Sequence, residues 1–124
     1  MPVIRSTEGT VYDIHGTTFT AYANSATGST ELCAWNGSIP PAQPGTEHRI
    51  SKEEIFLVRV GTPRFTVDGV ELDTAPGDVV VAPAGSLLKV ENPGDQDADI
   101  WVTTSTGLTA KLADGSHLAP PWAQ

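Results

Sequence analysis

The sequence predicts an all-β fold, and three observations point to it. The 124 residues include 12 glycines and 10 prolines, and only 18% of them are charged while 39% are hydrophobic. Runs of β-branched and aromatic residues alternate with turn-forming residues at intervals of roughly eight to twelve residues. The length suits one compact domain spanning residues 1–124. We therefore expect a single barrel of two packed antiparallel sheets.

The expected strands are the apolar runs that lie between successive turns. They cover residues 17–22, 30–35, 55–60, 64–67, 70–72, 78–82, 87–91 and 100–104. The turns contain glycine, proline, asparagine or aspartate, and they are His15-Gly16, Asn36-Gly37, Pro44-Gly45, Asp68-Gly69, Pro76-Gly77-Asp78, Pro83-Ala84-Gly85, Asn92-Pro93-Gly94-Asp95 and Asp114-Gly115. Asp68-Gly69 supplies two residues that tolerate a positive φ, so it predicts a type I′ hairpin.

Two segments interrupt the strand pattern. Ser51 followed by Glu54 resembles a helix-capping box, but β-branched and aromatic residues follow at once, so we expect a turn there. Near the end of the sequence, Pro120-Pro121-Trp122 cannot continue a hydrogen-bonded ladder. We expect this segment to leave the sheet, with Trp122 packed on a surface or over an opening.

The charge balance narrows the range of partners. Seven basic residues face 15 acidic ones, which gives a formal charge of -8 and disfavours nucleic acid and anionic membranes as partners. Cys33 is the sole cysteine and cannot form an internal disulfide. The sequence also lacks a long apolar stretch, so we expect a cytoplasmic protein. Motifs for dinucleotide binding, nucleotide hydrolysis, serine-triad catalysis and zinc proteolysis are missing.

Two segments, 44–61 and 77–92, resemble the two sequence motifs of the cupin superfamily. In the first segment, Glu54 and Gly61 have the spacing of the family motif. In the second, four positions match it: Gly77, Pro83, Gly85 and Asn92. The resemblance covers most of the chain and implies a double-stranded β-helix, or jelly-roll barrel.

The resemblance also implies where a metal site would lie. Metal-binding cupins resemble one another in holding a divalent ion with two histidines and a glutamate from the first motif and a histidine from the second. Counted from Glu54, the first-motif histidine positions fall on His48 and Ile50, and the second-motif position falls on Leu88. A first-row ion needs three or more protein ligands, so we expect no metal cofactor and at most weak divalent binding.

Other alignments of the metal positions do not restore the site. A longer permitted gap in the first motif places Glu47 and Arg49 at the two histidine positions. A third ligand from elsewhere in the chain would have to be His15 or His117, neither of which occupies a motif position.

Strand alternation predicts an apolar pocket with two polar groups. His48 shares a face with Ile50, and Glu54 shares a face with Phe56 and Val58 on the next strand. If these faces line the barrel, His48 and Glu54 are candidate catalytic residues that exchange a proton near neutral pH. The alternative is a purely structural pair. The expected ligand-binding residues are apolar: Trp35, Ile50, Phe56, Val58 and Leu88.

Three functions follow from this pocket. The first is a cupin that binds a small organic molecule at a degenerate metal site. The second is a metal-independent isomerase, dehydratase or cyclase that uses His48 and Glu54 for acid–base chemistry. The third is a metal-dependent, oxygenase-like cupin with an unusual ligand set. We also expect a homodimer, because Ile55 and Leu57 make the strand that begins near Glu54 apolar on its second face too. The alternative is that the N-terminal strand or the segment with Trp122 covers this face.

Overall fold

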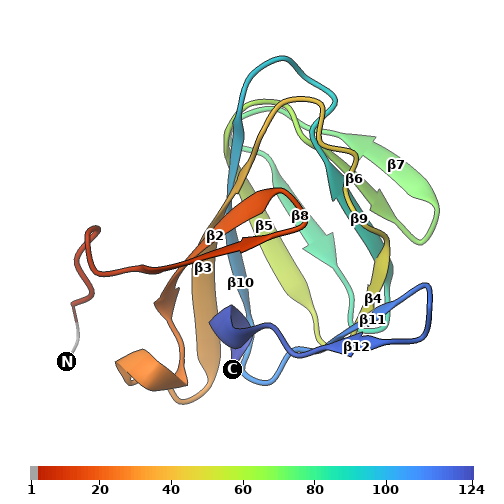
Figure 1. Ribbon diagram of the computed structural model, residues 1–124. Helices are drawn as coiled ribbons and strands as arrows, with labels where there is room; N and C mark the ends of the chain where they lie inside the picture. The colour runs from red at the N-terminus through yellow and green to blue at the C-terminus, as the bar shows by residue number, and fades with distance from the viewer. Residues whose placement is uncertain (1–2) are drawn as a thin grey trace.

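The computed structural model describes residues 3–124 and contains two six-stranded antiparallel sheets that face each other (Figure 1). The first sheet has the order β1-β2-β3-β10-β5-β8. Its strands are β1 (Thr10–Ile14), β2 (Thr17–Ala23), β3 (Leu32–Ile39), β5 (Glu54–Val60), β8 (Val79–Ala82) and β10 (Ala98–Ser105). The all-β jelly-roll architecture expected from the sequence is confirmed.

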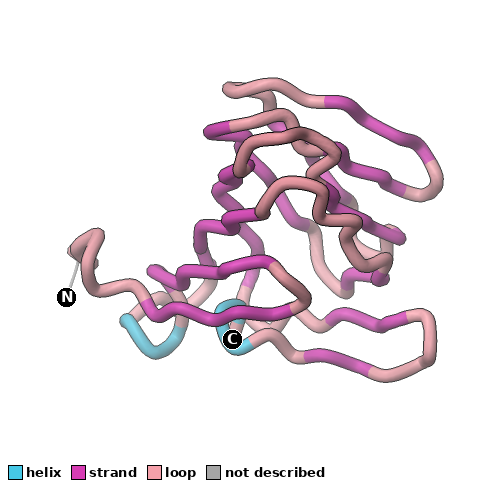
Figure 2. Tube along the Cα trace, turned by 45° about the horizontal axis from the view of Figure 1, so that its top comes forward, coloured by secondary structure: helices cyan, strands magenta, loops and turns pink. Residues whose placement is uncertain are grey.

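The second sheet has the order β12-β11-β4-β9-β6-β7. Its strands are β4 (His48–Ile50), β6 (Arg64–Val67), β7 (Val70–Asp73), β9 (Leu87–Glu91), β11 (Ala110–Leu112) and β12 (His117–Leu118). The helical content of the described residues is two 3-10 turns, η1 (Ser25–Thr27) and η2 (Pro121–Ala123), as Figure 2 shows. Among residues 3–124, no helix is long and apolar enough to cross a membrane.

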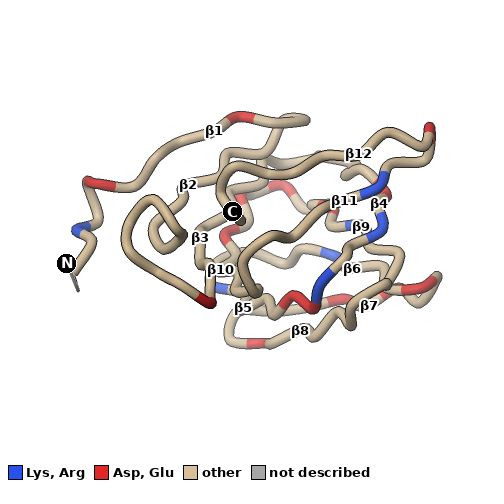
Figure 3. Tube along the Cα trace, turned by 90° about the horizontal axis from the view of Figure 1, so that it is seen from below, with Lys and Arg blue, Asp and Glu red and all other residues tan. Residues whose placement is uncertain are grey.

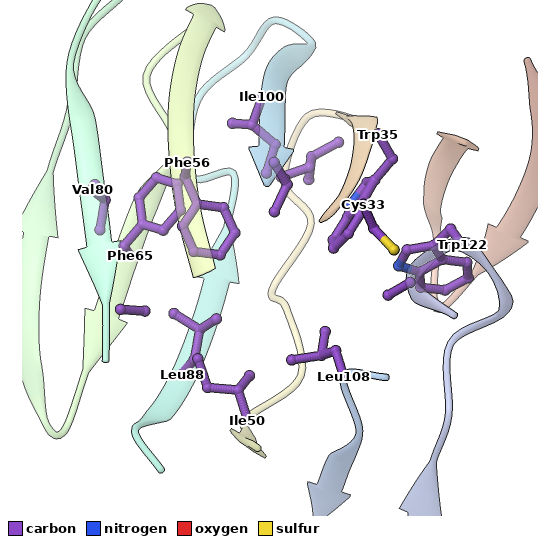
Figure 4. Packing of buried hydrophobic residues seen from close by; sticks show 14 of the residues in the cluster. Cys33, Trp35, Ile50, Phe56, Phe65, Val80, Leu88, Ile100, Leu108 and Trp122 are labelled. Atoms are coloured by element: carbon purple, nitrogen blue, oxygen red, sulfur yellow. The ribbon is translucent and has the colours of Figure 1, made fainter. Parts of the chain in front are cut away.

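Alternating burial along the strands builds the core between the sheets. On β3 and β10 every second residue is buried, and β5 follows the same pattern from Glu54 to Val58. Figure 4 shows the resulting cluster, in which Phe56 and Phe65 pack together and Leu88 lies beside Ile50. The ring centroids of the two phenylalanines are 5.0 Å apart.

Several local predictions agree with the structure. The hairpin between β6 and β7 turns at Asp68-Gly69, whose φ values of 49° and 82° are both positive. Ser51 and Lys52 form a bend rather than a helix. Trp122 is buried in η2, where its ring stacks on Phe19 with centroids 4.1 Å apart.

The expected turn at Asn36-Gly37 is wrong, because β3 runs straight through it. A Cβ on Gly37 would lie 3.2 Å from the Ile100 side chain, so the glycine permits close packing between β3 and β10. The first sheet also contains β1, which the apolar-run pattern did not predict.

Candidate functional site

A largely apolar cavity of about 140 Å³ lies between the sheets. Its walls come from the inward faces of β3, β5, β9 and β10, together with the β1–β2 hairpin and the segment from Leu108 to Trp122. Five of its lining residues are polar: His15, Thr17, Thr46, His48 and Glu54. A cavity of this size class can hold a single aromatic ring.

Glu54 is the first residue of β5 and is only 4% exposed. It pairs with Ala82 on β8 and with Thr104 on β10, so its side chain points between the sheets and lines the cavity. The Thr104 hydroxyl donates to the backbone oxygen of Glu53 at 2.6 Å instead of to the carboxyl. Among residues 3–124, no hydrogen bond or ion pair involves the Glu54 carboxyl group.

Burial raises the pKa of the Glu54 carboxyl from 4.5 to about 8. Removing a carboxylate from water disfavours its charged form, and no neighbouring donor or cation offsets that cost. At neutral pH Glu54 is therefore mainly a carboxylic acid, which can donate one hydrogen bond.

His48 lies at the start of β4, on the opposite sheet from Glu54. Its Nδ1 lies 2.8 Å from the backbone oxygen of Thr46. Because a carbonyl oxygen only accepts, Nδ1 carries the hydrogen and Nε2 of the neutral ring is left as an acceptor. Burial lowers the pKa of the His48 imidazole below its usual value. Nearby His15 also lowers this pKa, whereas the hydrogen bond with the Thr46 backbone raises it by a smaller amount than burial lowers it.

The structure brings most of the predicted site residues to this cavity. His48, Glu54, Trp35, Phe56 and Leu88 all line it. Ile50 and Val58 are buried in the surrounding core and do not line it.

The four metal-ligand positions that the resemblance implied fall on His48, Ile50, Glu54 and Leu88. His48 and Leu88 are direct cross-strand partners on β4 and β9. Ile50 and Leu88 are each 1% exposed and offer only hydrocarbon. Within residues 3–124, no three His, Cys, Asp or Glu side chains lie close enough to hold a metal ion, although His15 reaches the cavity. This donor set does not fit a first-row divalent ion.

Sequence reasoning missed the residues that close one side of the cavity. These come from the β1–β2 hairpin and from the last part of the chain, namely Ile14, Phe19, Leu108, Leu112, Leu118 and Pro120. The available clue was Trp122, because a tryptophan after two prolines was expected over a surface or an opening. In the structure Trp122 lines the cavity beside Phe19 and Tyr12, with centroids 4.1 and 5.6 Å away.

Two residues within the motif segments 44–61 and 77–92, Gly45 and Asn92, have structural roles. Asn92 is buried, and its Nδ2 donates to the backbone oxygens of Ile39 at 2.9 Å and Gln96 at 2.7 Å. Gly45 has a φ of 75°, and a Cβ there would lie 2.3 Å from the backbone oxygen of Val90. Both residues therefore shape the loops around the cavity without contributing a reactive group.

Comparisons with known proteins agree with this architecture. A family model described as the cupin domain matches residues 37–104. An RmlC-like cupin from Shewanella frigidimarina superposes with a TM-score of 0.74 at 19% identity, covering 85% of this chain and 90% of that one. The polyketide cyclase RemF from Streptomyces resistomycificus gives 0.74 at 15% identity, with coverage of 85% and 79%.

A third solved structure extends the same likeness. A sugar phosphate isomerase of the cupin superfamily from Silicibacter pomeroyi gives a TM-score of 0.66 at 19% identity, covering 90% of this chain and 85% of that one. At these identities the likeness concerns the fold. No curated protein sequence matches the chain.

Proposed function

Since the chain belongs to the cupin family, we propose that its barrel cavity binds a small organic molecule, with Glu54 and His48 as the polar contacts. The observation that carries this proposal is the Glu54 carboxyl, which faces the cavity and makes no hydrogen bond with residues 3–124. Leaving a buried polar group unpaired costs about 1–3 kcal/mol, and a ligand that pairs with it removes that cost. Trp35, Phe56 and Leu88 would supply the apolar contacts.

The test is a titration with ethylbenzene, an apolar ring compound. Binding is measured by NMR as the change in chemical shift of the Trp35 indole N–H. We expect saturable shifts in the parent protein. Ala110 lines the cavity, so Ala110→Leu fills part of it and weakens binding by about tenfold or more. Ala113 is exposed and outside the cavity, so Ala113→Leu is the matched control and leaves binding unchanged. Equal binding by both variants would contradict the proposal.

A metal-independent enzyme is the second candidate, and the opposed pKa shifts of two groups at one cavity favour it. The raised pKa keeps Glu54 protonated near neutral pH, so it can donate a proton. The lowered pKa keeps His48 neutral, and its Nε2 can accept a proton because Nδ1 is bonded to the Thr46 backbone oxygen. Such a pair can donate a proton to a carbonyl oxygen while it removes one from the adjacent carbon, as an isomerase, dehydratase or cyclase requires.

The two candidates are separated by isotope exchange. Acetophenone in deuterated water exchanges its methyl protons faster when a protein acid and base act on it. If the protein is an enzyme of this class, His48→Gln lowers its exchange rate by ~10²–10⁴ while binding persists. If the protein binds acetophenone but does not accelerate proton exchange, only the binding function is supported. A metal-dependent oxygenase has no comparable support, because Ile50 and Leu88 occupy two ligand positions.

The location proposed for the protein is the cytoplasm. Cys33 is a free thiol that is fully buried, and burial raises its pKa. A reducing compartment suits a chain whose fold uses a cysteine as a small core residue rather than as a disulfide partner.

A further inference from the structure

The charge of the cavity wall restricts which ligands it can accept. No lysine or arginine is among the described residues that line it. Figure 3 shows acidic residues spread along the chain, which carries a formal charge of -8. A phosphate or carboxylate brought into this cavity would lose its hydration and meet no counter-charge.

The surroundings of Glu54 argue against a cationic ligand as well. A carboxylate has about four lone-pair positions, and a buried ion pair is favourable only when further hydrogen bonds satisfy them. The hydroxyl of Thr104, its neighbour on β10, is committed to the Glu53 backbone oxygen. The ion pairs within residues 3–124 all involve Arg64, which lies on β6 of the other sheet. Within the part of the chain that the structure describes, no side chain therefore donates a hydrogen bond to either oxygen of Glu54.

A protonated carboxyl at this position requires fewer hydrogen-bond partners than a carboxylate does. Its O–H requires one acceptor, and the Glu54 carboxyl makes no hydrogen bond with the described residues. The rest of the wall is mostly apolar and includes the rings of Trp35 and Phe56, which Figure 4 shows within the buried cluster. A ligand with an acceptor oxygen on an apolar ring would accept a hydrogen bond from Glu54 and pack its ring against the apolar wall.

We propose that the ligand is an uncharged ring compound whose carbonyl-type oxygen accepts a hydrogen bond from the Glu54 carboxyl group. This inference rests on the proposed binding function and names its ligand class. The volume of about 140 Å³ accommodates one aromatic ring with a small substituent. Nε2 of His48 is a second contact, open to a donor on the same compound.

Four probes that share one ring test the proposal: acetophenone, ethylbenzene, benzoate and benzylammonium. We expect acetophenone to bind at least about tenfold more tightly than either charged probe. Glu54→Leu removes the donor without leaving a gap, so acetophenone loses about fivefold or more in affinity while ethylbenzene keeps its own. Glu54→Gln restores an uncharged donor, and acetophenone affinity recovers to within about threefold of the parent value.

The outcomes separate the ligand class from the binding function. If ethylbenzene binds but benzoate or benzylammonium matches acetophenone, the ligand class is wrong and the binding function stands. The same conclusion follows if Glu54→Leu weakens acetophenone and ethylbenzene equally. If no probe binds the folded parent protein, both proposals are overturned.

Discussion

The buried carboxyl of Glu54 makes a quantitative prediction about stability and pH. Burial raises its pKa to about 8 in the folded protein, against 4.5 for the same carboxyl exposed to water in the unfolded chain. Between these values the folded state holds a proton that the unfolded state has released. Stability attributable to this group is therefore fully present below about pH 4.5 and is lost as pH rises toward 8.

The size of the effect follows from the two pKa values. Each pH unit in this window removes about 1.4 kcal/mol from the free energy of unfolding, so the total loss approaches roughly 5 kcal/mol, with about 3 kcal/mol gone at pH 7. Glu54→Gln keeps a similar shape and cannot ionise, so it does not lose this stability. The variant should match the parent near pH 4.5 and exceed its stability by about 3 kcal/mol at pH 7.

The assay is urea unfolding of the parent and of Glu54→Gln at several pH values between about 4.5 and 8.5. Other titrating groups contribute equally to both proteins, so the difference in unfolding free energy isolates Glu54. His48 illustrates why the difference is needed: its lowered pKa makes stability fall as pH drops below its usual 6.5, opposite in sign to Glu54. A difference that stays flat across the window, or that favours the parent as pH rises, would refute this account.

Three further predictions concern closure of the cavity, assembly and metal binding. Trp122→Ala should lower the free energy of unfolding by about 3–5 kcal/mol in urea titrations, because a buried indole is lost; less than ~1 kcal/mol would mean the segment is not docked in solution. We expect a homodimer by sedimentation equilibrium, with Leu57→Lys shifting it to monomer because Leu57 and its β8 partner Val79 lie exposed; a monomeric parent contradicts this. The double substitution Ile50→His with Leu88→His should bind Zn²⁺ by calorimetry above the parent, and equal binding would mean the assumed motif register is wrong.

The sequence predicted strands best where a turn marked both ends. The expected strands 64–67 and 87–91 coincide with β6 and β9, and Asp68-Gly69 has the backbone expected of a tight hairpin. The short strands β11 and β12 were missed, because two or three residues are too few to display an alternating pattern. The prediction of a turn at Asn36-Gly37 is wrong. Gly37 is suited to its position by close packing against Ile100, and not by the backbone conformations that glycine allows in turns.

The site was less predictable than the fold. Motif spacing located His48 and Glu54, and both line the cavity. Alternation gives the face of a strand but not the depth along it, so it could not separate Phe56, which reaches the cavity, from Val58, which lies deeper in the core. Trp122 joins the wall through contacts between distant parts of the chain, which no local pattern describes.

The apolar side chains of Ile50 and Leu88 bear on the protonation state of the Glu54 carboxyl. A bound cation would stabilise the ionised form of Glu54, as an opposite charge does for any buried carboxyl. Ile50 and Leu88 offer hydrocarbon at both positions, each 1% exposed, and residues 3–124 contain no group of three ligands for such a cation. Burial is then the dominant influence on Glu54, and it favours the uncharged acid. Glu54 is therefore an uncharged acid at neutral pH, and the ligand class that we propose supplies an uncharged acceptor to that acid.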